Sequence, residues 1–199
     1  MATRLKLVFA SHNAHKVKEI GLKLEEEFEV LSLDDIACLD DIPETGITLE
    51  ENAILKARYV YKKFGLNCFA DDTGLEVKAL NGAPGVISAR YAGEGRNSED
   101  NIDKLLWKLD HLLDRDARFR TVICFINNGD ITLFEGIVNG RILLKRQGAG
   151  GFGYDAIFEP EGYEISFAEM SMEEKNRISH RGKAVDLLIA HLKNMNISI

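Results

Sequence analysis

The sequence predicts an α/β or α+β protein with a mixed β-sheet, divided into two lobes with a cleft between them. Strand-like and helix-like segments alternate through the first half of the chain, which is typical of α/β folds. A hairpin signal then follows, because Asn127-Asn128-Gly129-Asp130 separates the β-rich runs Phe119–Ile126 and Ile131–Val138. The length of 199 residues, 45% of them hydrophobic, suits one large domain or two small lobes.

Apolar runs and a helix cap predict the first elements. Leu5–Ala10 is expected to form a strand that ends at Ser11-His12-Asn13, where Asn13 can cap the next helix. The apolar positions of that helix are Val17, Ile20, Leu24 and Phe28. Val30–Leu33 is expected to form a second strand, and Asp34–Gly46 an acidic loop.

Two capping boxes predict where later helices begin. Thr48-Leu49-Glu50-Glu51 opens a helix that Gly65 would end as a left-handed cap, and Ser171-Met172-Glu173-Glu174 opens another. Cys68–Asp72 and Leu75–Ala79 are expected to be strand segments, and Asn81–Gly95 a glycine-rich loop. Apolar stripes predict two more helices, with Ile102, Leu105, Leu106, Leu109 and Leu112 in one and Val185, Leu188, Ile189 and Leu192 in the other.

The composition excludes several classes of protein. Hydrophobic residues make up 45% of the chain and charged residues 29%, ordinary values for a globular protein, so disordered, collagenous and disulfide-rich miniprotein classes do not fit. No apolar run approaches the ~20 residues of a membrane helix, and Met1–Ala10 lacks the pattern of a signal peptide. We therefore expect a cytoplasmic protein that does not enter a membrane. Its three cysteines, Cys38, Cys68 and Cys124, show no C-x-x-C spacing and are expected to be free thiols.

The net charge limits the partners. Twenty-five basic and 32 acidic residues give −7, which disfavours nucleic acid as a partner. A small anionic ligand remains compatible, since a local basic pocket or a metal ion can reverse the local field.

The loop Ser11-His12-Asn13-Ala14-His15-Lys16 is a candidate phosphate site. A helix start presents backbone N–H groups to an anion, and Lys16 adds a positive charge one turn into the helix. Plain capping by Asn13 beside an exposed lysine is the alternative.

The acidic residues around Asp71-Asp72 form a second candidate site, together with Glu44, Glu50 and Glu51. Carboxylates at a strand end suit Mg²⁺, which takes few protein oxygens and keeps waters and substrate phosphates. Adjacent side chains on a strand point to opposite faces, so we expect one of the two aspartates to face the cleft and the other to have a structural role. The alternative is a turn, because Asp-Asp-Thr-Gly is also good turn sequence.

Two later segments carry ligand-binding residue types. Gly148–Asp155 has four glycines and two aromatic residues, which would allow close backbone approach and stacking on a flat base. Lys175–Lys183 is basic in an otherwise acidic chain and could donate hydrogen bonds to carbonyl or phosphate oxygens. A mobile surface loop and a solvated helix face are the respective alternatives.

Six motifs occur in order along the chain: Ser11-His12-Asn13-x-x-Lys16; Glu44-Thr45-Gly46-x-Thr48-x-x-Glu51-Asn52-Ala53-x-x-Lys56-Ala57; Ala70-Asp71-Asp72-Thr73-Gly74-Leu75-x-Val77; Gly82-x-Pro84-Gly85-Val86-x-Ser88-Ala89-Arg90-Tyr91-Ala92-Gly93; Gly151-Phe152-Gly153-Tyr154-Asp155; and Ser179-His180-Arg181-Gly182-x-Ala184. This series resembles the inosine/xanthosine triphosphate pyrophosphatases, the Ham-type enzymes that act on non-canonical purine nucleotides. The motifs run from residue 11 to residue 184, nearly the whole chain.

The resemblance implies an activity and a fold. The activity is Mg²⁺-dependent hydrolysis of ITP, dITP and XTP to the monophosphate and pyrophosphate. The fold is a single domain over residues 1–199, two-lobed, with an elongated mixed sheet flanked by helices and a central cleft. The resemblance also implies a homodimer.

The resemblance further assigns roles by motif. Asp72 would be the catalytic carboxylate, and Asp72 and Glu44 would hold the metal, with Glu51 as the alternative to Glu44. The residues implied to bind substrate are Ser11, His12, Asn13, Ala14, His15, Lys16 and Lys56 at the phosphates, Thr73 beside them, and Phe152, Gly153, Tyr154, Asp155, Lys175, His180 and Arg181 around the base.

Two other functions remain open. A Maf-type pyrophosphatase would turn over pyrimidine or modified triphosphates faster than ITP, although the Ser-His-Arg and Asp-Asp-Thr-Gly segments argue against it. A nucleotide-sensing module would bind triphosphate without releasing pyrophosphate, and the retained Asp72, Lys16 and Glu44 argue against that.

Overall fold

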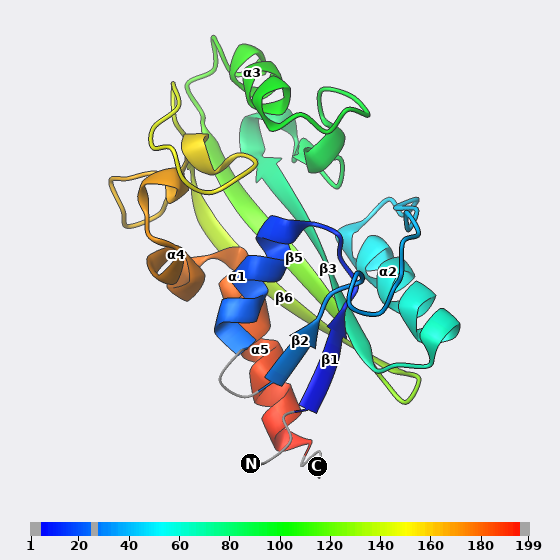
Figure 1. The fold of residues 1–199 in the computed structure, drawn as a ribbon. Coiled ribbons are helices and arrows are strands. Elements are labelled where there is room, and N and C mark those ends of the chain that lie inside the picture. Colours follow the sequence, from blue (N-terminus) through cyan, green and yellow to red (C-terminus); the bar gives the residue numbers. More distant parts are fainter. Residues whose placement is uncertain (1–4, 25–27, 196–199) are drawn as a thin grey trace. The chain divides into compact units, whose positions relative to one another are not determined.

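A computed structural model describes residues 5–24 and 28–195 (Figure 1). Its strands and α-helices are β1 (Leu5–Phe9), α1 (Ala14–Leu24), β2 (Phe28–Leu31), α2 (Leu49–Phe64), β3 (Cys68–Val77), β4 (Pro84–Gly85), α3 (Ser98–Lys108), β5 (Asp116–Asn127), β6 (Asp130–Ile142), β7 (Phe158–Pro160), α4 (Met172–Ile178) and α5 (His180–Asn194). The predicted α/β class with a mixed sheet is confirmed. The ends of the predicted 1–199 domain lie outside the described residues.

The sheet has the strand order β2-β1-β3-β5-β6-β7, and β4 pairs with β3. β1 runs parallel to β2, with Leu7 opposite Val30, and parallel to β3, with Phe9 opposite Phe69. β4 and β7 pair in the antiparallel sense with β3 and β6. Within the described ranges, no helix is both long enough and apolar enough to cross a bilayer.

The chain divides into two compact units. Unit 1 contains residues 1–72, 121–136 and 181–199, and unit 2 contains residues 73–120 and 137–180. The boundaries fall inside β3, β5, β6 and α5, so the neighbouring residues Asp72 and Thr73 belong to different units.

Unit 1 packs helices on both faces of its strands. Side chains of α1 and α5 form one core with Phe9 and Phe69, among others. The preceding residue of β3 faces the other way, since the Cys68 thiol donates a hydrogen bond to the carbonyl oxygen of Ala57 in α2. The alternation of β3 therefore sends odd-numbered side chains toward α1 and α5 and even-numbered side chains toward α2.

Unit 2 has its own core. Phe119, Phe158 and Phe167 pack with Leu75 and with Ile102 of α3. On this part of β3, Gly74 allows a close approach, since a Cβ there would lie 2.7 Å from the carbonyl oxygen of Gly85. The side chains of this core come from strands, α3 and the loops between them.

The structure confirms most predicted elements and corrects three. Phe28 begins β2 instead of continuing α1, and its backbone pairs opposite Leu5. β3 runs unbroken through Asp71-Asp72, and a short 3₁₀ helix at Lys78–Leu80 replaces the predicted end of the strand. α3 ends at Lys108, so Leu112 lies outside the helix and is 40% exposed.

Candidate active site

The predicted phosphate loop forms the start of α1. Asn13 Oδ1 accepts hydrogen bonds from the backbone N–H groups of His15 at 3.0 Å and Lys16 at 3.2 Å, and the N–H of Asn13 donates to Ser11 Oγ. The predicted capping role of Asn13 is thus confirmed. The His12 ring hydrogen-bonds through Nε2 to the carbonyl oxygen of Asp40 at 3.0 Å, which ties this loop to the acidic loop that follows β2.

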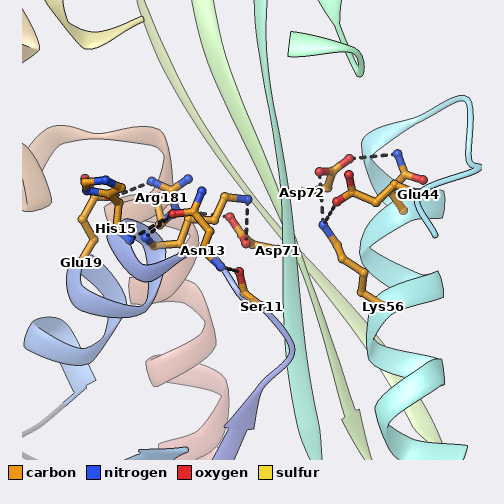
Figure 2. A network of polar contacts seen from close by, with 11 residues as sticks. Ser11, Asn13, His15, Glu19, Glu44, Lys56, Asp71, Asp72 and Arg181 are labelled. Atoms are coloured by element: carbon orange, nitrogen blue, oxygen red, sulfur yellow. Dashed lines mark hydrogen bonds and ion pairs between the residues drawn. The ribbon is translucent and has the colours of Figure 1, made fainter. Parts of the chain in front are cut away.

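The side chains of Asp71 and Asp72 point to opposite sides of β3, as strand alternation predicts (Figure 2). Asp71 lies on the side of α1 and α5, where Lys16 Nζ is 3.0 Å from Oδ1 and Arg181 Nε is 3.3 Å from Oδ2. Arg181 also donates to Glu19 Oε2 at 2.5 Å. We call Lys16, Glu19, Asp71 and Arg181 the Asp71 group.

The Asp71 group is a buried ion-pair network. Burial alone would raise the pKa of the Asp71 carboxyl, but Lys16 and Arg181 overcome that effect and hold the pKa below its usual range. Burial lowers the pKa of Lys16, and Asp71 opposes this only in part. Burial would likewise lower the pKa of Arg181, but Asp71 and Glu19 raise it above its usual value. Asp71 is therefore ionised and committed to cations on its own side of the strand.

Asp72 lies on the side of α2 in a different network (Figure 2). Lys56 Nζ is 2.6 Å from Glu44 Oε1 and 3.4 Å from Asp72 Oδ1. Asn52 Nδ2 donates to Asp72 Oδ2 at 3.1 Å. We call Glu44, Asn52, Lys56 and Asp72 the Asp72 group. The capping box at Thr48, which the sequence predicted, fixes where α2 begins and thus where Asn52 and Lys56 lie.

The charge of Asp72 is less well compensated than that of its neighbour. Burial raises its pKa above the usual value; Lys56 and Lys16 lower it, but not enough to reverse the shift, and Glu44 adds to the increase. Burial would lower the pKa of Lys56, but Asp72 and Glu44 raise it above the usual value. A carboxylate with a raised pKa in a buried polar network is typical of a functional group.

The arrangement of the acids favours Glu44 over Glu51 as the partner of Asp72. Glu51 Oε2 accepts the backbone N–H groups of Ile47 at 2.7 Å and Thr48 at 3.3 Å, so that carboxylate belongs to the capping box. The carboxylates of Glu44 and Asp72 instead converge on one cation, the Lys56 ammonium. Two carboxylates suit Mg²⁺, which completes its shell with water and phosphate oxygens. Among the described residues, no cluster of three or more His, Cys, Asp or Glu side chains could hold a metal.

The predicted base-side residues lie in unit 2, except Arg181. Asp155 Oδ2 accepts the backbone N–H of Phe152 at 2.8 Å and the Lys175 ammonium at 2.6 Å. Gly151 has φ +70°, and a Cβ there would lie 2.3 Å from the same oxygen, so only glycine lets the loop fold around this carboxylate. Lys175 Nζ lies 4.8 Å from the centroid of the Phe152 ring. Asp155 thus fixes the lysine that supports the aromatic ring.

Two further side chains of this set are buried. The Tyr154 ring belongs to the core of unit 2, and its hydroxyl donates to the carbonyl oxygen of Ser88 at 2.9 Å. This packing leaves Phe152 as the aromatic side chain of the loop that is partly exposed. His180 stacks on Phe119, with the ring centroids 4.5 Å apart. Thr73 follows Asp72 on β3 and is half-buried.

Sequence reasoning missed three residues that the structure connects to the candidate site. Asn52 lies within a motif that the sequence analysis quoted, but its contact with Asp72 spans 20 residues. Glu19 meets Arg181 across 162 residues, and no local signal indicates that pairing. Ser88 contacts Tyr154 through its backbone carbonyl, which any residue possesses.

A pocket of about 660 Å³ lies elsewhere in unit 2, lined by residues of β3, β5, β6 and β7. None of the predicted site residues lines it. Its charged walls are internally paired, with Arg118 Nε 2.6 Å from Glu76 and Arg141 Nε 2.7 Å from Glu159. The candidate catalytic and binding residues therefore lie in the Asp71 and Asp72 groups and in the Phe152 loop.

Comparisons with known proteins identify relatives of this chain by sequence and by structure. The model of the Ham1 family matches residues 7–191. The chain is 58% identical over 190 residues to the dITP/XTP pyrophosphatase of Flavobacterium psychrophilum, which covers 96% of this chain and 100% of the relative. It is 55% identical over 181 residues to the dITP/XTP pyrophosphatase of Porphyromonas gingivalis, covering 90% and 93% of the two chains. Among solved structures, the Staphylococcus aureus Ham1 protein matches with a TM-score of 0.87 at 41% identity, covering 96% of this chain and 100% of that one.

Proposed function

The chain belongs to the Ham1 family, and from this membership we propose that it hydrolyses dITP, XTP and ITP to the nucleoside monophosphate and pyrophosphate. The observation that carries the proposal is the Asp72 group, in which buried Asp72, half-buried Glu44 and the Lys56 ammonium meet beside the ion-paired Asp71. Such an arrangement can bind a triphosphate and activate water. We further propose that it acts as a cytoplasmic homodimer.

The proposed reaction is attack of water on the α-phosphorus, with pyrophosphate as the leaving group. Asp72 is positioned to accept the proton of the attacking water, because its carboxylate is oriented by Asn52 and Lys56. Lys16 and Lys56 would balance the negative charge that develops on the phosphate oxygens, aided by the backbone of residues 11–15. In this proposal both lysines are already placed by carboxylates before substrate arrives, which lowers the cost of ordering them.

We propose Mg²⁺ as the cofactor, held by Asp72 and Glu44. When bound, the ion would supply positive charge to the phosphate oxygens and make water a stronger acid. The support is the donor set itself: two carboxylates converge on a single cationic point, while Glu51 is committed to the start of α2.

The base side of the site would discriminate through the 6-oxo group. Hypoxanthine and xanthine carry an acceptor there, so donors from His180 and Arg181 could pair with it, whereas the adenine amino group would leave donors facing donors. Phe152, supported by Lys175, would stack on the base, with Gly153, Tyr154 and Asp155 shaping the loop. Thr73 would contact the substrate next to Asp72.

The test is pyrophosphate release from ITP, XTP, dGTP, ATP and dTTP, with Mg²⁺ and with excess chelator. We expect ITP and XTP to be turned over far faster than ATP, and only with the metal present. Comparable turnover of ATP, or full activity in chelator, would contradict the proposal. Faster turnover of dTTP than of ITP would favour a pyrimidine-directed enzyme, and tight binding without pyrophosphate release would favour a sensor.

A further inference from the structure

Asn52 joins the two halves of the Asp72 group. It is the fourth residue of α2, and its side chain is buried, with 1% of the residue exposed. The amide nitrogen donates to Asp72 Oδ2 at 3.1 Å, and the amide oxygen accepts the backbone N–H of Gly46 at 2.8 Å. Both ends of one carboxamide are therefore occupied, so its orientation is fixed.

The loop held by Asn52 is the one that carries Glu44. Gly46 lies two residues after Glu44 and packs tightly on the amide, since a Cβ at this position would lie 2.7 Å from Asn52 Oδ1. A residue larger than glycine would push the loop away from the amide. The Asn52 side chain thus connects the backbone next to one acid directly to the carboxylate of the other.

We propose that Asn52 is a positioning residue that sets the spacing between the carboxylates of Asp72 and Glu44 and so pre-forms their divalent-cation site. Its donor binds Oδ2 of Asp72, so that Oδ1 faces Lys56, the cation on which Glu44 also converges. Groups that hold a ligand in place without touching the metal raise affinity because the ligand is ordered before the ion arrives. This inference rests on the proposed function.

The chain offers a closely matched control in Asn101. It is the fourth residue of α3, and 3% of it is exposed. Its amide oxygen accepts the N–H of Ala92 at 2.6 Å, and its amide nitrogen donates to the carbonyl oxygen of Ala89 at 2.9 Å. It is thus a buried carboxamide that also ties a loop to a helix start, but its hydrogen bonds go to backbone atoms, whereas Asn52 holds a carboxylate.

The experiment compares Asn52→Ala with Asn101→Ala in the full-length chain. Mn²⁺ binding is measured without substrate by electron paramagnetic resonance and calorimetry, alongside melting temperature and kcat with ITP. We expect both variants to lose melting temperature, because each leaves buried backbone or side-chain groups without a partner. Asn52→Ala should weaken Mn²⁺ binding roughly 10- to 100-fold, whereas Asn101→Ala should stay within about twofold of the parent. Equal effects of the two variants on Mn²⁺ affinity would overturn the inference.

A second variant tests the loop half of the argument and covers the case in which Asn52→Ala does not fold. Gly46→Ala keeps the Asn52 amide and places a methyl group against it, so it should also weaken Mn²⁺ binding roughly 10-fold. Unchanged Mn²⁺ affinity in Gly46→Ala would refute the link from loop to carboxylate. If the parent protein neither binds Mn²⁺ nor releases pyrophosphate from ITP, the proposed function fails together with this inference. If the parent does both and Asn52→Ala behaves like the parent, the inference alone fails.

Discussion

Replacing either aspartate of β3 by asparagine should give opposite results, although the chemical change is the same. In Asp71→Asn, the buried cations Lys16 and Arg181 lose a carboxylate that lies 3.0 and 3.3 Å away. Breaking a buried ion pair by removing one partner costs roughly 3–5 kcal/mol. For a chain of this size, each 1 kcal/mol corresponds to about 2–4 °C, so the melting temperature should fall by roughly 6–20 °C.

Asp72→Asn removes a charge that the fold does not favour. Burial raises the pKa of Asp72, so the ionised form is already disfavoured relative to water, and Lys56 keeps Glu44 at 2.6 Å after the change. The melting temperature should therefore stay the same or rise. Turnover should fall about 10²- to 10⁴-fold or more, because the proposed proton acceptor is lost. A residue that is costly to the fold but required for activity is typical of an active site.

The assay pairs kcat for pyrophosphate release from ITP with the melting temperature of each variant. Asp116→Asn is the control for charge removal, since its ion pair with Lys78 is exposed, and it should match the parent in both measurements. The reasoning is refuted if Asp71→Asn abolishes turnover with an unchanged melting temperature while Asp72→Asn remains active. The catalytic assignment would then move by one residue along β3.

Two other predictions separate roles within the site. Glu44→Gln should lower turnover and raise the Mg²⁺ concentration needed for half-maximal activity. Glu51→Gln should do neither, because a glutamine oxygen can accept the same backbone N–H groups as the capping carboxylate. The reverse pattern in a Mg²⁺ titration would contradict this prediction. Tyr154→Phe should cost about 0.5–1.5 kcal/mol at pH 7, since it loses the hydrogen bond to Ser88. Burial raises the pKa of Tyr154 in the folded protein above the unfolded value of about 10. The contribution of its neutral hydroxyl to folding stability is therefore complete below about pH 10 and decreases as the pH rises further. Urea unfolding between pH 9 and 11 should show a shallower loss of stability for Tyr154→Phe than for the parent, and equal slopes would contradict the prediction.

The features that sequence predicted best are those decided by a few neighbouring residues. In the caps at Asn13, Thr48 and Ser171, each cap side chain accepts a backbone N–H from two or three positions further along, and all three caps are present. The divergence of Asp71 and Asp72 follows from strand alternation alone. These predictions held because the governing contacts are local.

What sequence could not predict depends on contacts between distant segments. Lys16 and Asp71 are 55 residues apart in the sequence. Strand alternation predicts that the two aspartates point to opposite faces, but not which of them pairs with Lys16. The same applies to Asn52, whose hydrogen bond to Asp72 joins residues 20 positions apart. The helical spacing of apolar residues predicts that the helix includes Phe28, whereas its strand pairing with β1 determines its conformation.

The charge balance explains why only one of two adjacent acids is suited to a divalent cation. The four side chains of the Asp71 group carry two positive and two negative charges, so a metal ion there would gain no net attraction and would face two cations. The charged side chains of the Asp72 group are one lysine and two carboxylates, which leaves one negative charge in excess. The raised pKa of Asp72 and the lowered pKa of Asp71 agree with that difference in charge balance. A cation bound beside Asp72 would neutralise this excess negative charge. Of the two aspartates, the one whose charge is less well balanced by neighbouring cations is thus the one proposed to bind the metal.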